Sequence, residues 1–398
     1  MSARVFKSVP KWVLSIPIRF IKLFSQISFE MREMIDRAWV ALIISRVSDV
    51  HDLLELYIYH YRNLPQQQTQ EWRDERVHII GGSEIATVLG NNKYSTMENL
   101  INIKLGLKIF GGNICTRWGT SFESVVVAIL EREYNTKVMN TGSIGGLNEN
   151  GVYIQTYSPD GLAIINGDIV LLEIKSPYSR IPSGIVPKEY MDQVLLGLGT
   201  IPVAKSALFV DACFRTCTYS EWDYNGVCNT RVKDIVFSEP IYLGFTITTT
   251  QGDGNFIREH IKTLISAPNL TEEKLIEDSM GYDVYQHFIT HVVSTSRKFE
   301  NAPTICDPIS LAYPPTEGGD IYFTDKREGY RDMHIETIKE YFRKNMIITS
   351  ITFWKLFYLQ KNKVERDPKY MENVREPIRN VLHTIKSREV ALRLSATS

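Results

Sequence analysis

The chain has 398 residues, of which 43% are hydrophobic and 23% charged, and its formal net charge is −1. This composition is typical of a globular protein with a large core, and it excludes a disordered or collagen-like chain. The apolar runs are all far shorter than a bilayer-spanning helix. The five cysteines are odd in number and form no CxxC pair, which argues against a disulfide framework and a four-thiolate zinc site and favours a reducing compartment.

The charge is unevenly distributed along the chain. Residues 343–398 contain twelve Lys or Arg and five Asp or Glu, residues 1–50 contain eight and four, and the middle of the chain is correspondingly acidic. Metal-binding carboxylates beside a phosphate-binding surface would produce such a pattern, and so would helices that present charged faces to water. The charge alone favours the second interpretation.

The periodicity of apolar residues predicts two domains. Residues 9–21 are apolar but short and interrupted by proline, so we expect no secretory signal there. Residues 1–70 are expected to form a helical N-terminal extension. The second domain, 71–398, is divided into a motif-bearing core at 71–224, a variable insertion at about 225–345 and a closing strand and helix at 346–390.

Within this division the pattern predicts a mixed α/β fold. A helix, a glycine turn and a second helix are expected over 71–105, and an amphipathic helix over 116–134. Strands are expected over 136–180, at 207–215 and over 347–364, and helices over 187–198 and 368–388. The 225–345 stretch reads as irregular.

An Asn-Gly pair at 166–167, flanked by apolar runs, predicts a tight β-hairpin. A two-residue turn there pairs residue 165 with residue 168, and the same register brings Asp160 opposite Glu173. Lys175 follows on the same face as Glu173 because side chains alternate along a strand. Two carboxylates facing each other destabilise a sheet unless something offsets their charge. Oxygen ligands alone favour Mg²⁺ or Mn²⁺ as the compensating ion.

Two carboxylates and a lysine around a hard cation form a set suited to hydrolysing phosphodiesters. The alternative is a surface hairpin with a Glu–Lys pair, since a D…ExK pattern arises often by chance. The flanking Ser158-Pro159 and Ser176-Pro177 pairs strengthen the functional interpretation.

Four other polar residues can be explained either by a structural role or by a role in binding a metal or a phosphate. Thr120 and Glu123 fit a capping box at a helix start, and Glu123 equally fits a further metal-facing carboxylate. Gln193, on the expected helix, is either a surface residue or a hydrogen-bond donor to a phosphate or water. Arg76 and Ser83, around Gly81-Gly82, fit a phosphate pocket, although an N-cap serine after a glycine turn is common.

Taken in order, these motifs resemble the lambda-type exonuclease, or YqaJ viral recombinase, family of PD-(D/E)XK nucleases. The resemblance is nearest to members from large cytoplasmic DNA viruses and more distant from baculovirus and herpesvirus alkaline nucleases. The shared motifs are Trp72-x3-Arg76, Gly81-Gly82-Ser83-Glu84, Tyr94, Trp118-Gly119 with Glu123, Ser158-Pro159-Asp160-Gly161, Glu173-Ile174-Lys175-Ser176-Pro177 and Tyr190-x-x-Gln193. Glu84 departs from the aspartate, and Ser176 from the cysteine, that many relatives have.

The resemblance implies a restriction-endonuclease-like core, a mixed β-sheet flanked by helices, and a role for each residue. Asp160, Glu173, the Ile174 carbonyl and Glu123 would hold two Mg²⁺ ions, with Mn²⁺ as an alternative. Lys175 would position the attacking water. The phosphate-binding residues would be Arg76, Ser83, Ser158 and Gln193.

The function implied is a metal-dependent DNA exonuclease, 5′ to 3′ on duplex ends, in viral recombination or genome processing. Its partners would be DNA ends and a single-strand annealing protein, inside the cytoplasm or nucleus of an infected cell, without stable membrane association. Relatives include toroidal trimers and monomers, so the oligomeric state stays open. The alternatives are a structure-selective or alkaline endonuclease, an RNA-degrading enzyme, and a non-catalytic DNA-binding protein on a nuclease fold.

Overall fold

The structure is a computed structural model, and it describes part of the chain. The described residues are 29–62, 64–65, 69, 76–108, 114–150, 152–178, 180, 182–217, 230–232, 235–237, 242–251, 320–324 and 346–396. Trp72 and the basic residues before position 29 lie outside them.

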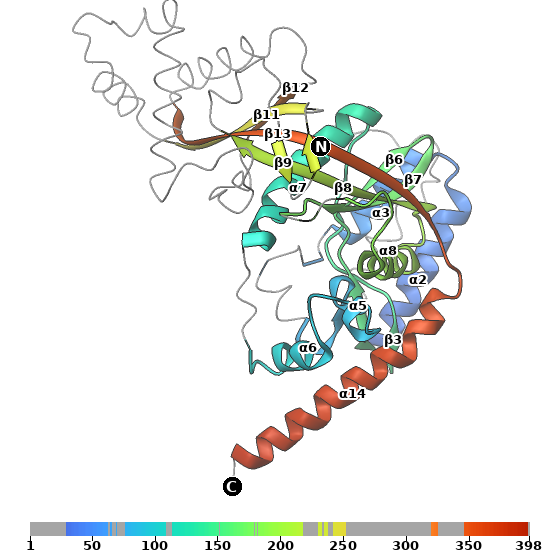
Figure 1. The fold of residues 1–398 in the computed structure, drawn as a ribbon. Coiled ribbons are helices and arrows are strands. Elements are labelled where there is room, and N and C mark those ends of the chain that lie inside the picture. The colour runs from blue at the N-terminus through green and yellow to red at the C-terminus, as the bar shows by residue number, and fades with distance from the viewer. Residues whose placement is uncertain are drawn as a thin grey trace, which may run out of the picture.

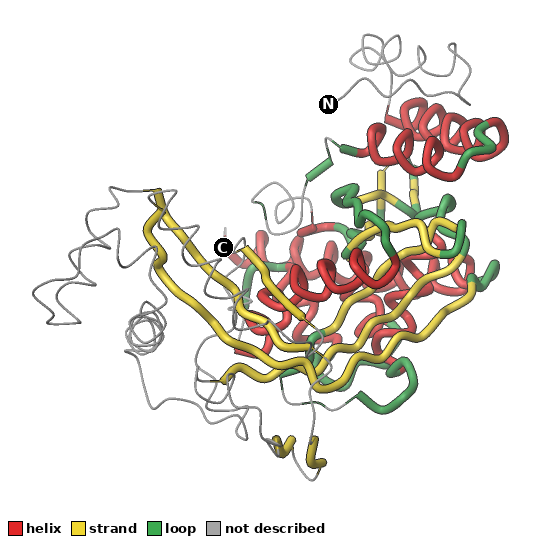
Figure 2. The backbone as a smooth tube through the Cα atoms, turned by 90° about the horizontal axis from the view of Figure 1, so that it is seen from above, coloured by secondary structure: helices red, strands yellow, loops and turns green. Residues whose placement is uncertain are grey.

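The centre of the fold is a six-stranded mixed sheet with strand order β12-β11-β13-β8-β7-β6. Its strands are β6 (Gly161–Ile165), β7 (Asp168–Lys175), β8 (Ser206–Cys217), β11 (Tyr242–Gln251), β12 (Asp320–Thr324) and β13 (Met346–Glu365). Only β7 and β8 pair in parallel within this sheet, and the other neighbours are antiparallel. Helix α8 (Lys188–Thr200) makes the crossover that a parallel pair requires. Figure 2 shows strands of this sheet reaching well beyond the helices.

Strand β7 is buried on both faces, which explains its nearly continuous apolar sequence. Ile169 and Leu171 pack with Val194 and Leu198 of α8 on one face. On the other face, a cluster joins the alternate residues of β7 to helix α7 (Ile114–Tyr134), and its central members are Val170, Leu172, Ile174, Trp118, Phe122 and Phe214. The polar residues at the ends of β6 and β7 are therefore set between two helical layers.

Two N-terminal helices, α2 (Phe29–Arg46) and α3 (Val50–Tyr61), lie within the predicted extension 1–70, of which residues 1–28 fall outside the described part of the chain. Asp49 caps α3 by accepting hydrogen bonds from the backbone N–H groups of His51 and Asp52, at 2.9 and 3.0 Å. Trp39, Ile43 and Tyr57 share the hydrophobic cluster of β7 and α8. These helices therefore contribute directly to the core that carries the sheet.

A small sheet with the order β1-β5-β2 lies beside the main one. It joins β1 (Ile80–Gly81), β2 (Ile144–Gly145) and β5 (Gln155–Tyr157), and a hairpin of β3 (Asn148–Glu149) and β4 (Val152–Tyr153) adjoins it. The short elements η1 (Arg76–His78), η2 (Gly82–Glu84), α5 (Ile85–Val88) and α6 (Met97–Lys104) surround β1. The predicted helix–turn–helix over 71–105 is thus more broken than expected.

The closing helix α14 (Tyr370–Ala396) is longer than predicted and extends away from the sheet in Figure 1. Its first turns pack on α5, α6 and α8 through Val374 and Ile378. Arg366, between β13 and α14, donates to the carbonyls of Leu198, Ile201 and Ala204, and the last two bonds are 3.1 and 2.5 Å long. Arg366 thereby supplies donors to carbonyls at the C-terminal end of α8 and in the turn that follows it.

The stretch from 225 to 345 contains strands where the sequence reads as irregular. β9 (Thr230–Val232) and β10 (Ile235–Phe237) form a separate hairpin. Strands β11 and β12 extend the main sheet, with β11 pairing along β13. This part of the insertion is therefore continuous with the sheet that carries the hairpin of β6 and β7.

Candidate active site

The hairpin of β6 and β7 has the predicted register. Ile165 pairs with Asp168 and Gly161 with Leu172. Asn166 and Gly167 have φ angles of 52° and 83°, which is the left-handed pair that a type I′ turn requires. The ladder of these two strands ends at Gly161, so Asp160 lies one residue outside it and is not in register with Glu173 as a bonded pair.

Asp160 is instead tied to β7 through its side chain. Its Oδ2 accepts a hydrogen bond of 2.7 Å from the backbone N–H of Ile174. Asp160 is half-buried at the end of the Ser158-Pro159 segment. The carboxylate therefore lies beside the backbone that joins Glu173 to Lys175.

Glu173 is fully buried, and protein donors hold both of its carboxylate oxygens. The hydroxyl of Tyr157, on β5, donates to Oε2 at 2.6 Å. The Lys175 ammonium forms a short contact with Oε1. Lys175 also lies 5.3 Å from the centroid of the Tyr190 ring on α8. The predicted grouping of Asp160, Glu173 and Lys175 is present.

The charges of this group perturb one another. Burial, followed by the charge of Glu173, raises the pKa of Asp160 well above its usual range, and Glu123 adds to the effect. Burial would lower the pKa of Lys175, but the charges of Glu173 and Asp160 raise it. Burial and the charge of Glu173 also raise the pKa of Tyr157, which keeps its hydroxyl protonated as a donor. The site concentrates negative charge that Lys175 offsets in part.

Glu123 lies on α7, and its predicted capping role is wrong. The helix begins at Ile114, so Thr120 is in its second turn rather than at its start. Glu123 is half-buried and close enough for its charge to raise the pKa of Asp160. No three His, Cys, Asp or Glu side chains among the described residues lie close enough to form a metal cluster. The structure thus places Glu123 near Asp160 without gathering three carboxylates.

The predicted phosphate pocket brings Arg76 and Ser83 together. Arg76 Nη2 donates to Ser83 Oγ at 3.4 Å, and Ser83 is exposed. Gly81 allows this arrangement, because a Cβ there would lie 2.2 Å from the same nitrogen. The guanidinium consequently lies against the backbone of the glycine pair.

Glu84 and Lys104 hold Arg76 and the backbone around Gly81 in place. Glu84 accepts from the Gly81 N–H at 2.7 Å and contacts Arg76 at 3.3 Å and Lys104 at 2.9 Å. Lys104 is buried and donates to the carbonyls of Arg76 and Ile79 at 2.5 and 2.6 Å. Burial alone would raise the pKa of Glu84, but the charges of Arg76 and Lys104 hold it below its usual range.

Helix α8 faces the group of Asp160, Glu173 and Lys175 through Tyr190, whose ring lies near the Lys175 ammonium. Gln193 follows about one helical turn later and is half-buried. Ser158 is half-buried immediately before Pro159 and Asp160. Both predicted phosphate ligands therefore belong to segments that border the site.

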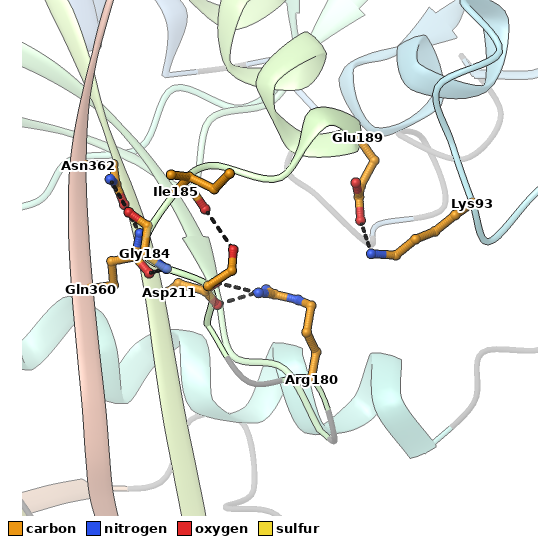
Figure 3. A network of polar contacts seen from close by, with 9 residues as sticks. Lys93, Arg180, Gly184, Ile185, Glu189, Asp211, Gln360 and Asn362 are labelled. Atoms are coloured by element: carbon orange, nitrogen blue, oxygen red, sulfur yellow. Dashed lines mark hydrogen bonds and ion pairs between the residues drawn. The ribbon is translucent and has the colours of Figure 1, made fainter. Parts of the chain in front are cut away.

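Figure 3 shows a polar network that includes Arg180, Asp211, Glu189 and Lys93. Arg180 makes a two-point ion pair with the buried Asp211, at 2.6 and 2.8 Å. Asp211 is the β8 partner of Lys175 in the parallel ladder, and Arg180 lies 5.6 Å from the Tyr190 ring. Lys93 pairs with Glu189 at 2.6 Å on the same turn of α8. The Arg180–Asp211 pair thus lies beside Tyr190, and the Lys93–Glu189 pair involves the residue before it on α8.

Tyr157, Arg180 and Asp211 are site residues that the sequence did not predict. A tyrosine two residues before Pro159 reads as an ordinary strand residue. Arg180 and Asp211 are separated by 31 positions, and only the parallel pairing of β7 with β8 brings them together. The Tyr190-x-x-Gln193 motif was the only signal available for this side of the site.

Comparison with known proteins finds a family match for the segment that carries these motifs. Residues 71–200 match the YqaJ-like viral recombinase domain. A protein of African swine fever virus, isolate Tick/Malawi/Lil 20-1/1983, is 29% identical over 228 residues, which are 50% of this chain and 65% of that protein. Its counterpart from the isolate Tick/South Africa/Pretoriuskop Pr4/1996 is 27% identical over 267 residues, 58% of this chain and 76% of that protein. The chain thus spans slightly less than two thirds of the first of these relatives.

Solved structures with detectable similarity include an alkaline exonuclease, LHK-Exo, from Laribacter hongkongensis. It is 25% identical, with 36% of this chain and 74% of that one covered and a TM-score of 0.30. LHK-Exo in complex with dAMP is 27% identical, with 36% and 73% covered and a TM-score of 0.30. Among the described residues, no helix is both long and apolar enough to span a membrane.

Proposed function

We propose, from the match of residues 71–200 to the YqaJ-like viral recombinase domain, that the protein is a metal-dependent DNA exonuclease. The observation that supports this most strongly is the group of Asp160, Glu173 and Lys175 on one tight hairpin. Lys175 is present beside two carboxylates, as a hydrolytic site requires, and this argues against a non-catalytic protein on the same fold. The PD-(D/E)XK assignment of the core belongs to the same proposal.

Oxygen donors on the hairpin suit a hard dication. The proximity of Asp160 and Glu173 raises the electrostatic cost of ionising both carboxyl groups, and a divalent ion would offset it. Asp160, Glu173 and the Ile174 carbonyl would hold two Mg²⁺ ions, with Mn²⁺ as an alternative, and Glu123, which is not clustered with the other two carboxylates, would reach the ions through water. When bound, these ions polarise the phosphate and acidify a water molecule.

The residues of the chain supply the remaining chemistry. The Lys175 ammonium, held by Glu173 and partly open to solvent, would orient the attacking water. Arg76 and Ser83 would hold a phosphate through a guanidinium and a hydroxyl, and Ser158 and Gln193 would contact the scissile one. A pocket for a terminal phosphate favours duplex ends and 5′ to 3′ polarity.

The setting we propose is recombination or genome processing of a virus, inside an infected cell. The relatives from African swine fever virus are viral proteins, which supports this setting. A single-strand annealing protein would use the strand that the exonuclease exposes. The oligomeric states that belong to this proposal are a monomer and a ring-shaped trimer.

Digestion of an end-labelled linear duplex tests this function. With Mg²⁺ the protein should release mononucleotides from the 5′ end, and with Ca²⁺ or EDTA it should release none. A covalently closed circle of the same sequence is the matched substrate, and it should remain intact. Cutting of the circle would identify an endonuclease, release from a matched RNA duplex alone would identify a ribonuclease, and binding without Mg²⁺-dependent release would identify a non-catalytic protein.

A further inference from the structure

The Tyr157 side chain connects parts of the site that are distant in sequence. Its hydroxyl donates to Glu173 Oε2 at 2.6 Å, and both side chains are fully buried. Because Lys175 contacts the other oxygen, Oε1, the carboxylate is held at both ends. The orientation of Glu173 therefore depends on a tyrosine of a different sheet.

The Tyr157 ring occupies space that two glycines leave open. A Cβ on Gly82 would lie 2.6 Å from Cδ2 of the ring, and a Cβ on Gly197 would lie 2.4 Å from Cζ. Gly82 begins η2, immediately before Ser83, and Gly197 is one helical turn after Gln193 on α8. The ring is thus inserted between the predicted phosphate pocket and the helix that carries Gln193.

We infer that Tyr157 is a positioning residue of the active site, which fixes the carboxylate of Glu173 for metal binding and sets the spacing between the phosphate pocket and α8. The inference rests on the proposed function, since it assigns Glu173 to the metal. The Tyr157 side chain then has two roles. The hydroxyl orients the ligand, and the ring maintains the geometry of the neighbouring backbone.

The physical reason is the hydrogen-bond balance of a buried carboxylate. Hydrogen bonds to a metal ligand from outer residues orient it, and their loss typically weakens metal binding by about 10–100-fold. In Tyr157→Phe the ring is retained, so packing against Gly82 and Gly197 is unchanged. The Oε2 atom loses its donor, and Glu173 can rotate about its contact with Lys175.

The experiment measures Mn²⁺ binding without DNA, by titration calorimetry, for the full chain and for Tyr157→Phe. We expect the variant to bind Mn²⁺ roughly 10–100-fold more weakly. Raising the Mn²⁺ concentration should restore DNA hydrolysis, and the preference for 5′-phosphorylated ends should be unchanged because the ring remains. Equal Mn²⁺ affinities of the two proteins would overturn the inference.

A pair of glycine variants on one helix tests the role of the ring. Gly197→Ala places a methyl against Tyr157, whereas Gly199→Ala meets the flexible Met371 side chain, whose Sδ would lie 2.3 Å away. We expect Gly197→Ala to weaken Mn²⁺ binding and Gly199→Ala to leave it at the wild-type value. Similar Mn²⁺ affinity in the two variants would contradict the role of the ring, even if both melt at lower temperature.

The two hypotheses fail in different ways. A wild-type protein that neither binds Mn²⁺ nor hydrolyses DNA removes the proposed function and the inference together. A wild-type protein that does both, with Tyr157→Phe indistinguishable from it, removes the inference alone.

Discussion

Arg76 is fixed by its neighbours before any ligand arrives. Gly81, Ser83 and Glu84 all lie against its guanidinium, and Lys104 holds the backbone carbonyl of the same residue. A side chain that is already ordered loses little entropy when it binds a phosphate. This is the property that a pocket for a DNA end requires.

Replacing Arg76 tests the phosphate pocket. In Arg76→Ala we expect the preference for 5′-phosphorylated over 5′-hydroxyl ends to fall by roughly tenfold or more, because a charge-assisted hydrogen bond is lost. Initial rates on the two substrates measure it. Arg388→Ala is the matched control, since Arg388 is paired with Glu98 at 2.6 Å on the surface of α14. A wild-type protein that cuts both ends equally would leave the pocket without support.

The stabilising contribution of Glu84 to the folded protein should depend on pH. Its pKa is lowered in the folded protein, so its contribution is present above the usual carboxyl pKa and is lost as the pH falls through the lowered value. We expect Glu84→Gln to be less stable than wild type at pH 7, with the difference shrinking below about pH 4. Urea unfolding at pH 7 and at lower pH measures this. A difference that does not change with pH would contradict the ionised role of Glu84.

At the scale of elements, Arg366 joins β13 and α14 to the end of α8. In Arg366→Met three carbonyls lose a charged donor while most of the side-chain volume remains. We expect the free energy of unfolding to fall by at least about 2–4 kcal/mol, because each hydrogen bond to a charged group contributes about 1.5–3 kcal/mol. Lys363→Met is the control, because Lys363 pairs with Glu365 on the surface. Equal denaturation midpoints for the two variants would contradict this role.

Local patterns predicted the elements whose determinants are local. The Asn166-Gly167 turn and the alternation around it determine the register of β6 and β7, and the apolar stripe over 188–200 determines α8. The strands β11 and β12 were not predicted, because the pairing of β11 with β13 depends on residues about a hundred positions apart. The Thr120-x-x-Glu123 pattern led to a wrong prediction of the helix start. A capping-box pattern also occurs inside a helix, and α7 begins six residues before Thr120.

The candidate site likewise combines contacts that local sequence determines with contacts between segments distant in sequence. Asp160, Glu173 and Lys175 follow from one hairpin, so their grouping was predictable. The hydrogen bond of Tyr157 to Glu173 joins two sheets, and the Arg180–Asp211 pair joins segments that lie on either side of a helix in the sequence. Neither contact has a signal in sequence spacing.

At the scale of the whole molecule, three basic residues of the C-terminal segment pair with acidic residues from the middle of the chain. Arg379 pairs with Glu149, Arg388 with Glu98, and Lys361 with Glu133. This supports the interpretation of charged faces rather than a continuous DNA-binding surface. The double variant Arg379→Ala/Arg388→Ala should therefore bind duplex DNA with wild-type affinity and salt dependence, as fluorescence anisotropy would measure. A reduction of the salt slope by about two would instead assign both arginines to phosphates.

Cleavage of linear duplex by Lys175→Ala tests the central claim most directly. The assay uses saturating Mg²⁺, with circular dichroism to verify folding and Asp160→Asn as an isosteric second variant. We predict that the wild type releases nucleotides and that both variants, though folded, release none at a measurable rate. If folded Lys175→Ala cut the duplex at the wild-type rate, the hairpin of Asp160, Glu173 and Lys175 would not be the catalytic centre.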